Sequence, residues 1–251
     1  MSTAPDSTAF PLAPPPFAGD SRVVPPSHAF DWLHFGWLMF VAESGVWVGI
    51  TVLLLVGLLL VASVPFIGMA AVHLLLPILT GGLMAGCRRI EDGGKLSVRD
   101  LFTGFSGQAR ELVNAGVLYM VAWLAIVGIG ILFASVSVMA GVFQASPAGF
   151  GIALSGILMT ALLTSVLAMP LLMAIWFAPA LIVLHGMKTV PALKASFLAC
   201  ARNWLVFTVF GIMTVLLLFF ALLPMGLGFL VLLPVLFGAL YASYRDLFIG
   251  A

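Results

Sequence analysis

Charged residues are what this sequence has least of. Of its 251 residues, 10 are Lys or Arg and 9 are Asp or Glu, which is 8%, whereas 63% are hydrophobic. A soluble globular domain carries about 25% charged residues. Charge is missing altogether from Ser44–Cys87, Leu112–Met187 and Asn203–Tyr244, runs of 44, 76 and 42 residues. The composition excludes a soluble domain and predicts a protein that is surrounded by lipid.

The uncharged runs set the number of membrane spans. A span needs about 20 apolar residues to cross about 30 Å of hydrocarbon, so the outer runs hold two spans each, and the middle run holds two long spans or three. Lys and Arg gather in residues 88–110 and 188–202 and at Arg245, and basic short loops stay in the cytoplasm. If the middle run held three spans, the two basic segments would face opposite sides of the membrane. Two spans place both segments on the cytoplasmic side.

We therefore expect an all-α polytopic membrane protein with six transmembrane helices in three hairpins. Both termini are expected in the cytoplasm, and residues 27–251 form a single membrane domain. The expected spans are about 45–64, 67–87, 112–140, 152–186, 204–223 and 227–244. The location that follows is an inner membrane, crossed several times.

Cysteines and catalytic motifs are also scarce. The two cysteines, Cys87 and Cys200, fall at cytoplasmic helix ends, where thiols stay reduced, so we expect no disulfide and no metal site. Residues 92–95, Asp-Gly-Gly-Lys, lack the spacing and the Ser or Thr of a phosphate-binding loop. No acid pair, Ser-His-Asp set or Cys-His cluster fits the roles that catalysis requires. We predict no enzyme, no cofactor and no nucleic-acid partner.

The first 26 residues differ from the rest of the chain in composition. They hold seven prolines among Ser, Thr, Ala and Gly. Such a stretch buries too little apolar surface to offset the entropy lost on ordering, which predicts a disordered cytoplasmic tail. A signal peptide is not expected, because the stretch has no basic start followed by an apolar core.

Two basic segments match each other at a constant offset of 92 residues. Residues 97–110 match residues 189–202, and a weaker copy precedes the first span. The aligned triplets are Leu33, Gly36 and Trp37; Leu101, Gly104 and Phe105; and Leu193, Ser196 and Phe197. Apolar residues recur at helical spacing in these segments, which predicts an amphipathic helix in the membrane interface before each hairpin. Ser97 with Asp100, and Ser27, are expected to cap such helices.

Prolines recur in the spans as well. In the second span of each hairpin, Pro77, Pro170 and Pro234 each begin a run of Pro, aliphatic, Leu, any residue, then Gly or Ala. The predicted unit is an interfacial helix, a span, a turn and a proline-kinked span, used three times in parallel orientation. The fourth span contains Pro170 and Pro179. The sequence does not decide whether this span is one kinked helix or is broken at these prolines.

These segments also carry a resemblance to a known family. The stretches are LLPILTGGLMAGCRR at 75–89, LFTGF at 101–105, WFAPALIVLHG at 176–186, ALKASFLACARNW at 192–204 and LLPVLFGALYASYRD at 232–246. They resemble a proteobacterial family of inner-membrane proteins of unknown function over about residues 30–248. More distantly, the chain is similar to the membrane domain of some glycerophosphodiester phosphodiesterases. The resemblance implies the fold and the inner-membrane location but no catalytic residue.

One ionisable residue is expected inside a span, and such a residue is a functional hypothesis by default. His73 lies about two turns into the second span, and with Pro77, Pro170 and Pro234 it forms a candidate intramembrane polar site. The alternative, which we favour, is a neutral imidazole bonded to a neighbouring helix. His185, before Gly186, is expected to cap the end of the fourth span.

Two functional hypotheses follow. In the first, a membrane-organising or accessory protein uses its cytoplasmic amphipathic helices to engage anionic lipid headgroups or a partner, through Arg99, Arg110, Lys194 and Arg202. The partners are then membrane lipids, and a protein partner or a second copy of the chain is the alternative. In the second, a transporter, channel or lipid-handling protein has a site near the proline-broken spans. We favour the first.

Overall fold

The computed structural model describes residue 17 and residues 19–65, 67–144 and 146–250. Within these residues the chain forms nine α-helices, one 3₁₀ helix and no strand. In chain order they are α1 (His28–Ala42), α2 (Ser44–Ala62), α3 (Gly68–Glu91), η1 (Val98–Phe105), α4 (Ala109–Gln144), α5 (Pro147–Trp176), α6 (Ala178–His185), α7 (Thr189–Arg202), α8 (Trp204–Leu222) and α9 (Phe229–Phe248). Six helices, with α5 and α6 taken as one, are long and apolar enough to cross a membrane. The predicted all-α, six-span fold class is confirmed.

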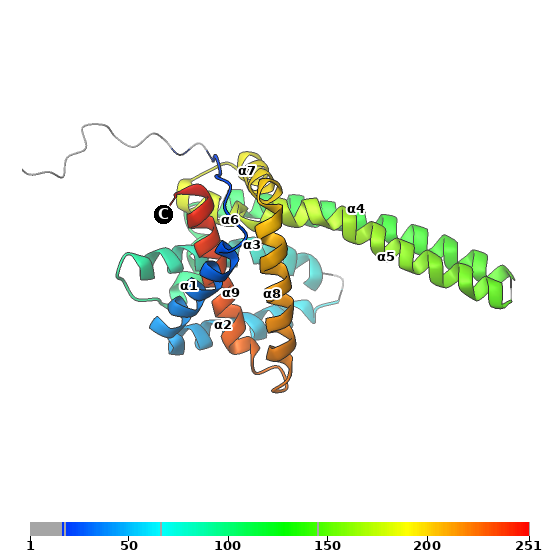
Figure 1. Ribbon diagram of the computed structural model, residues 1–251, viewed down its shortest axis with the longest axis horizontal. Helices are drawn as coiled ribbons and strands as arrows, with labels where there is room; N and C mark the ends of the chain where they lie inside the picture. The colour runs from blue at the N-terminus through cyan, green and yellow to red at the C-terminus, as the bar shows by residue number, and fades with distance from the viewer. Residues whose placement is uncertain (1–16, 18, 66, 145, 251) are drawn as a thin grey trace, which may run out of the picture.

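The third and fourth spans form a long hairpin. Figure 1 shows α4 and α5 running together, away from the rest of the molecule. α4 has 36 residues, about 54 Å at 1.5 Å per residue, whereas the hydrocarbon layer is about 30 Å thick. Its side chains are mostly apolar and exposed. A surface of this kind suits contact with lipid.

The fourth span is broken rather than smoothly kinked, and the break lies at Phe177. α5 ends at Trp176, and α6 begins at Ala178 with Pro179 in its first turn. The Phe177 N–H donates to the Ser196 side-chain oxygen of α7 at 2.9 Å. Because Pro179 has no N–H to donate, a proline suits this helix start. Pro170 lies within α5 and does not end it.

A short helix precedes each hairpin: α1 before α2, η1 before α4 and α7 before α8. η1 is a 3₁₀ helix, and Ser97 and Asp100 form the predicted capping box at its start. Ser27 makes no side-chain bond at the start of α1, so that expectation was wrong. "Short helices" below means α1, η1 and α7.

Each short helix packs against the second span of a hairpin through an aligned small residue. The contacts are Gly36 of α1 on Val235 of α9, Gly104 of η1 on Ile78 of α3, and Ser196 of α7 on Phe177 between α5 and α6. The pairing also joins the two ends of the described chain, because α1 packs on α9. In all three short helices, the aligned small residue is thus the point of contact with a span.

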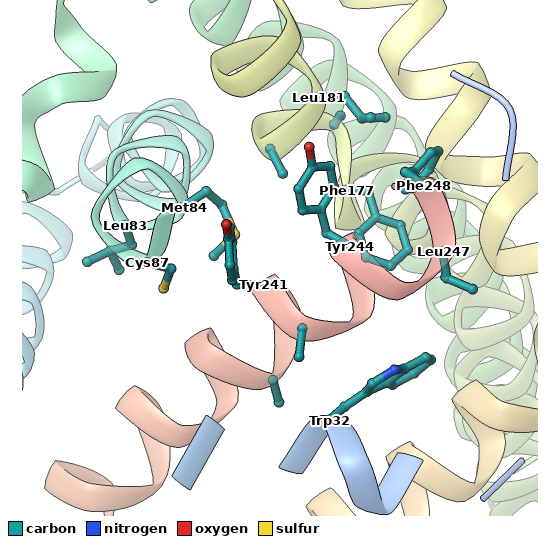
Figure 2. Close-up of a cluster of buried hydrophobic side chains, with 14 of the residues drawn as sticks. Trp32, Leu83, Met84, Cys87, Phe177, Leu181, Tyr241, Tyr244, Leu247 and Phe248 are labelled. Carbon is teal, nitrogen blue, oxygen red and sulfur yellow. The ribbon is translucent and has the colours of Figure 1, made fainter. Parts of the chain in front are cut away.

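The core lies where these helix pairs meet, around α9. Figure 2 shows side chains from α1, α3, α6 and α9 in one cluster. Trp32 of α1, Met84 of α3 and Leu181 of α6 are at most 2% exposed, as are Tyr241 and Tyr244 of α9. Burial of this extent is concentrated at the ends of the helices that carry the charged loops.

Part of the N-terminal segment lies on this core. Residues 1–16 and 18 of the predicted disordered tail lie outside the described residues. Residues 19–26 are placed, and they contact the body: the Arg22 N–H donates to Leu247 O at 2.9 Å, and the Val24 N–H donates to Asn203 Oδ1 at 2.9 Å. This stretch is therefore a strap over the end of the helices. It extends the ordered chain further toward the N-terminus than we expected.

Candidate functional site

One carboxylate makes several of the contacts that hold the strap and α1 on α9. Asp246, near the end of α9, accepts from Trp32 Nε1 at 2.8 Å, is bonded to His28 Nδ1 at 2.7 Å and pairs with Arg22. The Arg22 Nε also donates to the backbone oxygen of Asp246 at 2.6 Å. The Asp246 side chain is only 13% exposed. This network joins the strap and α1 to α9.

A second network joins the ends of α3, α6 and α9. Tyr241 donates to Glu91, which also pairs with Arg245. His185 bonds the Tyr244 hydroxyl. The predicted role of His185 as a helix cap was therefore wrong: Gly186, in the left-handed conformation, ends α6 by donating to Ile182 O. The imidazole instead ties α6 to α9.

Polar residues at the starts of two spans hold neighbouring segments. Glu111, in the first turn of α4, accepts from the Thr189 N–H at 2.9 Å and from its hydroxyl at 2.6 Å. Asn203, 92 residues later, holds Val24 as described and donates to Arg22 O at 3.0 Å. Glu111 therefore holds the start of α7, and Asn203 holds the strap.

The four cations of the first functional hypothesis have a different environment. Arg99, Arg110, Lys194 and Arg202 are all exposed. Among the residues that the structure describes, none of the four forms an ion pair, whereas Arg22, Arg88, Arg89 and Arg245 all do. These four side chains remain available to an anion outside the chain.

Aromatic side chains accompany these cations. Trp37, Phe105 and Phe197 occupy the position after the small packing residue of each short helix, and they are 48%, 45% and 37% exposed. Each short helix therefore buries its small residue and exposes an aromatic one. A helix with exposed aromatic and basic side chains suits the membrane interface.

The favoured bond between His73 and a neighbouring helix was wrong, because among the described residues this side chain of α3 has no hydrogen-bond partner on another helix. Its Nδ1 bonds the Met69 backbone oxygen of its own helix at 2.6 Å. The ring stacks on Tyr119 of α4 with centroids 5.6 Å apart and lies beside Trp123. The surroundings are those of a packed side chain.

Of the three prolines, only Pro77 shares a helix with His73, one turn further along α3. Pro77 and Pro234 are buried in α3 and α9, where the residues that follow them pack on different short helices. Pro170 is exposed on α5. The four candidate residues are therefore divided among three helices, α3, α5 and α9.

The cysteines offer a direct test of the predicted topology. Cys87 and Cys200 are 0% and 3% exposed, and burial raises the pKa of the Cys200 thiol to about 12. Because only thiolates react readily, we expect no labelling of the native protein by a charged maleimide at neutral pH. Gln144→Cys, at the exposed last residue of α4, should then be labelled from outside intact cells. Lys95→Cys should need permeabilised cells, and the reverse pattern would invert the topology.

Sequence reasoning missed the residues that organise this end of the protein. Asp246 and Tyr241 carried no signal beyond their place near the last span. Asn203 was recognisable only as an amide at a span start. Among the described residues, no group of three or more His, Cys, Asp or Glu could hold a metal.

Comparison with known proteins gives one relative. The chain is 30% identical over 221 residues to a probable inner membrane protein of Burkholderia thailandensis, covering 85% of this chain and 80% of that protein. No family model and no solved structure matches the chain. With six apolar helices, this relative supports a multi-pass inner-membrane protein. The distant resemblance to the membrane domain of glycerophosphodiester phosphodiesterases stays a prediction.

Proposed function

This chain belongs to the family of the Burkholderia thailandensis inner membrane protein, and we propose that it is a membrane-organising or accessory protein that engages anionic lipid headgroups. The surface that we assign to this task consists of the three short helices. In this proposal the charged ends of the spans face the cytoplasm, because short loops rich in Lys and Arg are retained there.

The observation that carries the proposal is the repeated surface pattern of the short helices. Each has an exposed aromatic residue directly after its small packing residue: Trp37, Phe105 or Phe197. Unpaired, exposed cations lie on η1 and α7 and beside the starts of α4 and α8. Each Lys or Arg near an anionic surface contributes about 1 kcal/mol to the attraction, and the aromatic rings anchor at headgroup depth. Together they favour an interfacial surface that selects anionic lipid.

Lipid selectivity in proteoliposomes tests this proposal. Trp37 and Trp204 are the exposed tryptophans near this surface, at 48% and 60% exposure, so brominated lipids should quench their fluorescence on contact. Wild-type protein should be quenched more by brominated phosphatidylglycerol than by brominated phosphatidylcholine. Replacement of all four cations by Gln should lower this preference at least about tenfold, from about 1 kcal/mol for each cation.

The control keeps the charges and exchanges the residue types. A variant with Arg99→Lys, Arg110→Lys, Lys194→Arg and Arg202→Lys should keep the wild-type preference. An unchanged preference in the Gln variant would refute the proposal and leave a protein partner as the reason for these exposed cations. Crosslinking in cells then becomes the informative experiment.

The alternative hypothesis was a transporter, channel or lipid-handling protein built around the prolines. It required His73 and the three prolines to surround a hydrated cavity near the middle of the membrane. The separate positions of Pro77, Pro170 and Pro234, and the packed ring of His73, give no observation that favours it.

A further inference from the structure

A groove opens between the start of α4 and the start of α7. Its volume is about 420 Å³, which lies within the range of roughly 300–1,000 Å³ common for small-molecule sites. It is lined by Glu111, Asn114, Val117, Leu118, Lys188, Thr189, Val190 and Pro191. These residues come from one face of α4 and from the segment that opens α7.

The groove changes from polar to apolar along α4. Lys188 and Glu111 lie at its polar end, and Val117 and Leu118 continue it into the uncharged part of the span. Leu118 is seven residues beyond Glu111, about 10 Å along the helix. An amphipathic helix in the interface buries its apolar face to a similar depth, about 5–10 Å. The groove is thus polar where a lipid headgroup would lie and apolar where the first part of an acyl chain would lie.

Hydrogen-bond donors are free at the polar end. The Glu111 carboxylate is occupied by Thr189, which donates both its N–H and its hydroxyl. Within the described parts of the chain, the Lys188 ammonium has no ion-pair partner and the Asn114 amide has no hydrogen bond, and both residues are exposed. A cation and an amide donor suit a phosphate oxygen.

The corresponding position in the next unit is filled by the chain itself. Asn203, 92 residues after Glu111, bonds the backbone of Val24 and Arg22. At the start of α8 the strap therefore covers the polar residue that opens the span. At the start of α4 the equivalent residue, Glu111, is bonded by Thr189 of α7, and the groove lies open beside this contact.

We infer that this groove binds one phospholipid. Its headgroup phosphate accepts from Lys188 and Asn114, and one acyl chain runs along Val117 and Leu118. The inference rests on the proposed function in one respect, since both place this end of α4 at the cytoplasmic interface. It adds a defined lipid site to the diffuse attraction of Arg99, Arg110, Lys194 and Arg202.

Native mass spectrometry of the full chain in detergent, titrated with dioleoyl phosphatidylglycerol, tests the site. Wild-type protein should retain one lipid more tightly than the rest. The double variant Lys188→Gln with Asn114→Leu should bind that lipid at least about tenfold more weakly, since it loses the ammonium group and the amide that donate to the phosphate. Lys194→Gln, exposed on α7 outside the groove, should leave the tight lipid in place.

Further arms separate the other outcomes. Val117→Trp fills the groove without touching the bond between Glu111 and Thr189, so it should also displace the lipid while thermal unfolding stays as in wild type. Retention of the tight lipid in both groove variants would overturn the inference. Competition by inorganic phosphate alone at the lipid's concentration would also overturn it, because the acyl chain would then contribute nothing. The four-cation Gln variant should lose the diffuse preference and keep the tight lipid, which separates the two proposals.

Discussion

Gly36→Val and Gly104→Val should each lower the free energy of unfolding by about 3 kcal/mol or more. A Cβ added at Gly36 would lie 2.1 Å from the backbone oxygen of Val235, and one at Gly104 would lie 2.1 Å from that of Ile78. No side-chain rotation relieves an overlap with backbone atoms, so the helix pair must separate. Overpacking of this kind typically costs about 1–3 kcal/mol, and occasionally more.

Thermal unfolding in detergent, followed by circular dichroism, measures this effect. Gly49→Val is the matched control, because Gly49 is an exposed glycine of α2 with no atom within 4 Å of an added Cβ. It should change the stability by less than about 0.5 kcal/mol. Equal stability of Gly36→Val and Gly49→Val would mean that α1 does not pack on α9 as described.

Asp246→Ala should destabilise the protein by about 3 kcal/mol and release the strap. The change leaves the buried indole N–H of Trp32 and the partly exposed Arg22 without their acceptor. Removing one partner of a buried charged network costs about 3–5 kcal/mol, and the exposure of Arg22 places the expected value at the lower end. Limited proteolysis should then cut within residues 19–26 faster than in wild type.

Asp92→Ala is the control for this change. Asp92 is 66% exposed and pairs with Arg88 one helical turn away at 3.8 Å. Exposed pairs of this kind contribute less than about 1 kcal/mol. Asp246→Asn, which keeps one acceptor oxygen, should fall between the two. Identical proteolysis of Asp246→Ala and Asp92→Ala would show that Asp246 does not hold the strap.

The sequence predicted the spans because charge and length constrain them directly. The runs without charged residues, between Glu43 and Arg88 and between Arg202 and Arg245, leave few places where a helix can end. The middle run was harder to divide, since 76 uncharged residues fit more than one arrangement. The positive-inside rule resolved it correctly, and the long hairpin of α4 and α5 accounts for the excess length.

Breaks and long-range contacts were not predictable in the same way. The break at Phe177 depends on Ser196, which accepts the freed N–H from another helix. The order of residues 19–26 depends on Asn203 and Asp246, which lie far away in the chain. Neither contact can be recognised from neighbouring residues in the sequence, because each joins segments that meet only in the folded protein.

The candidate site was predicted only in part. The exposure of Arg99, Arg110, Lys194 and Arg202 follows from amphipathic spacing, and the structure has these side chains at the surface. The role of Lys188 with Asn114 was not foreseen. It depends on how closely α7 approaches α4, which the bond between Thr189 and Glu111 fixes.

The packing of α1 on α9 also constrains how the protein is made. Trp32 and Asp246 are 214 residues apart in the chain, so α1 emerges from the ribosome first and meets its partner last. Until α9 has been inserted, Gly36 and its neighbours have no surface to pack on. Any product truncated before α9 therefore leaves α1 without the surface on which it packs.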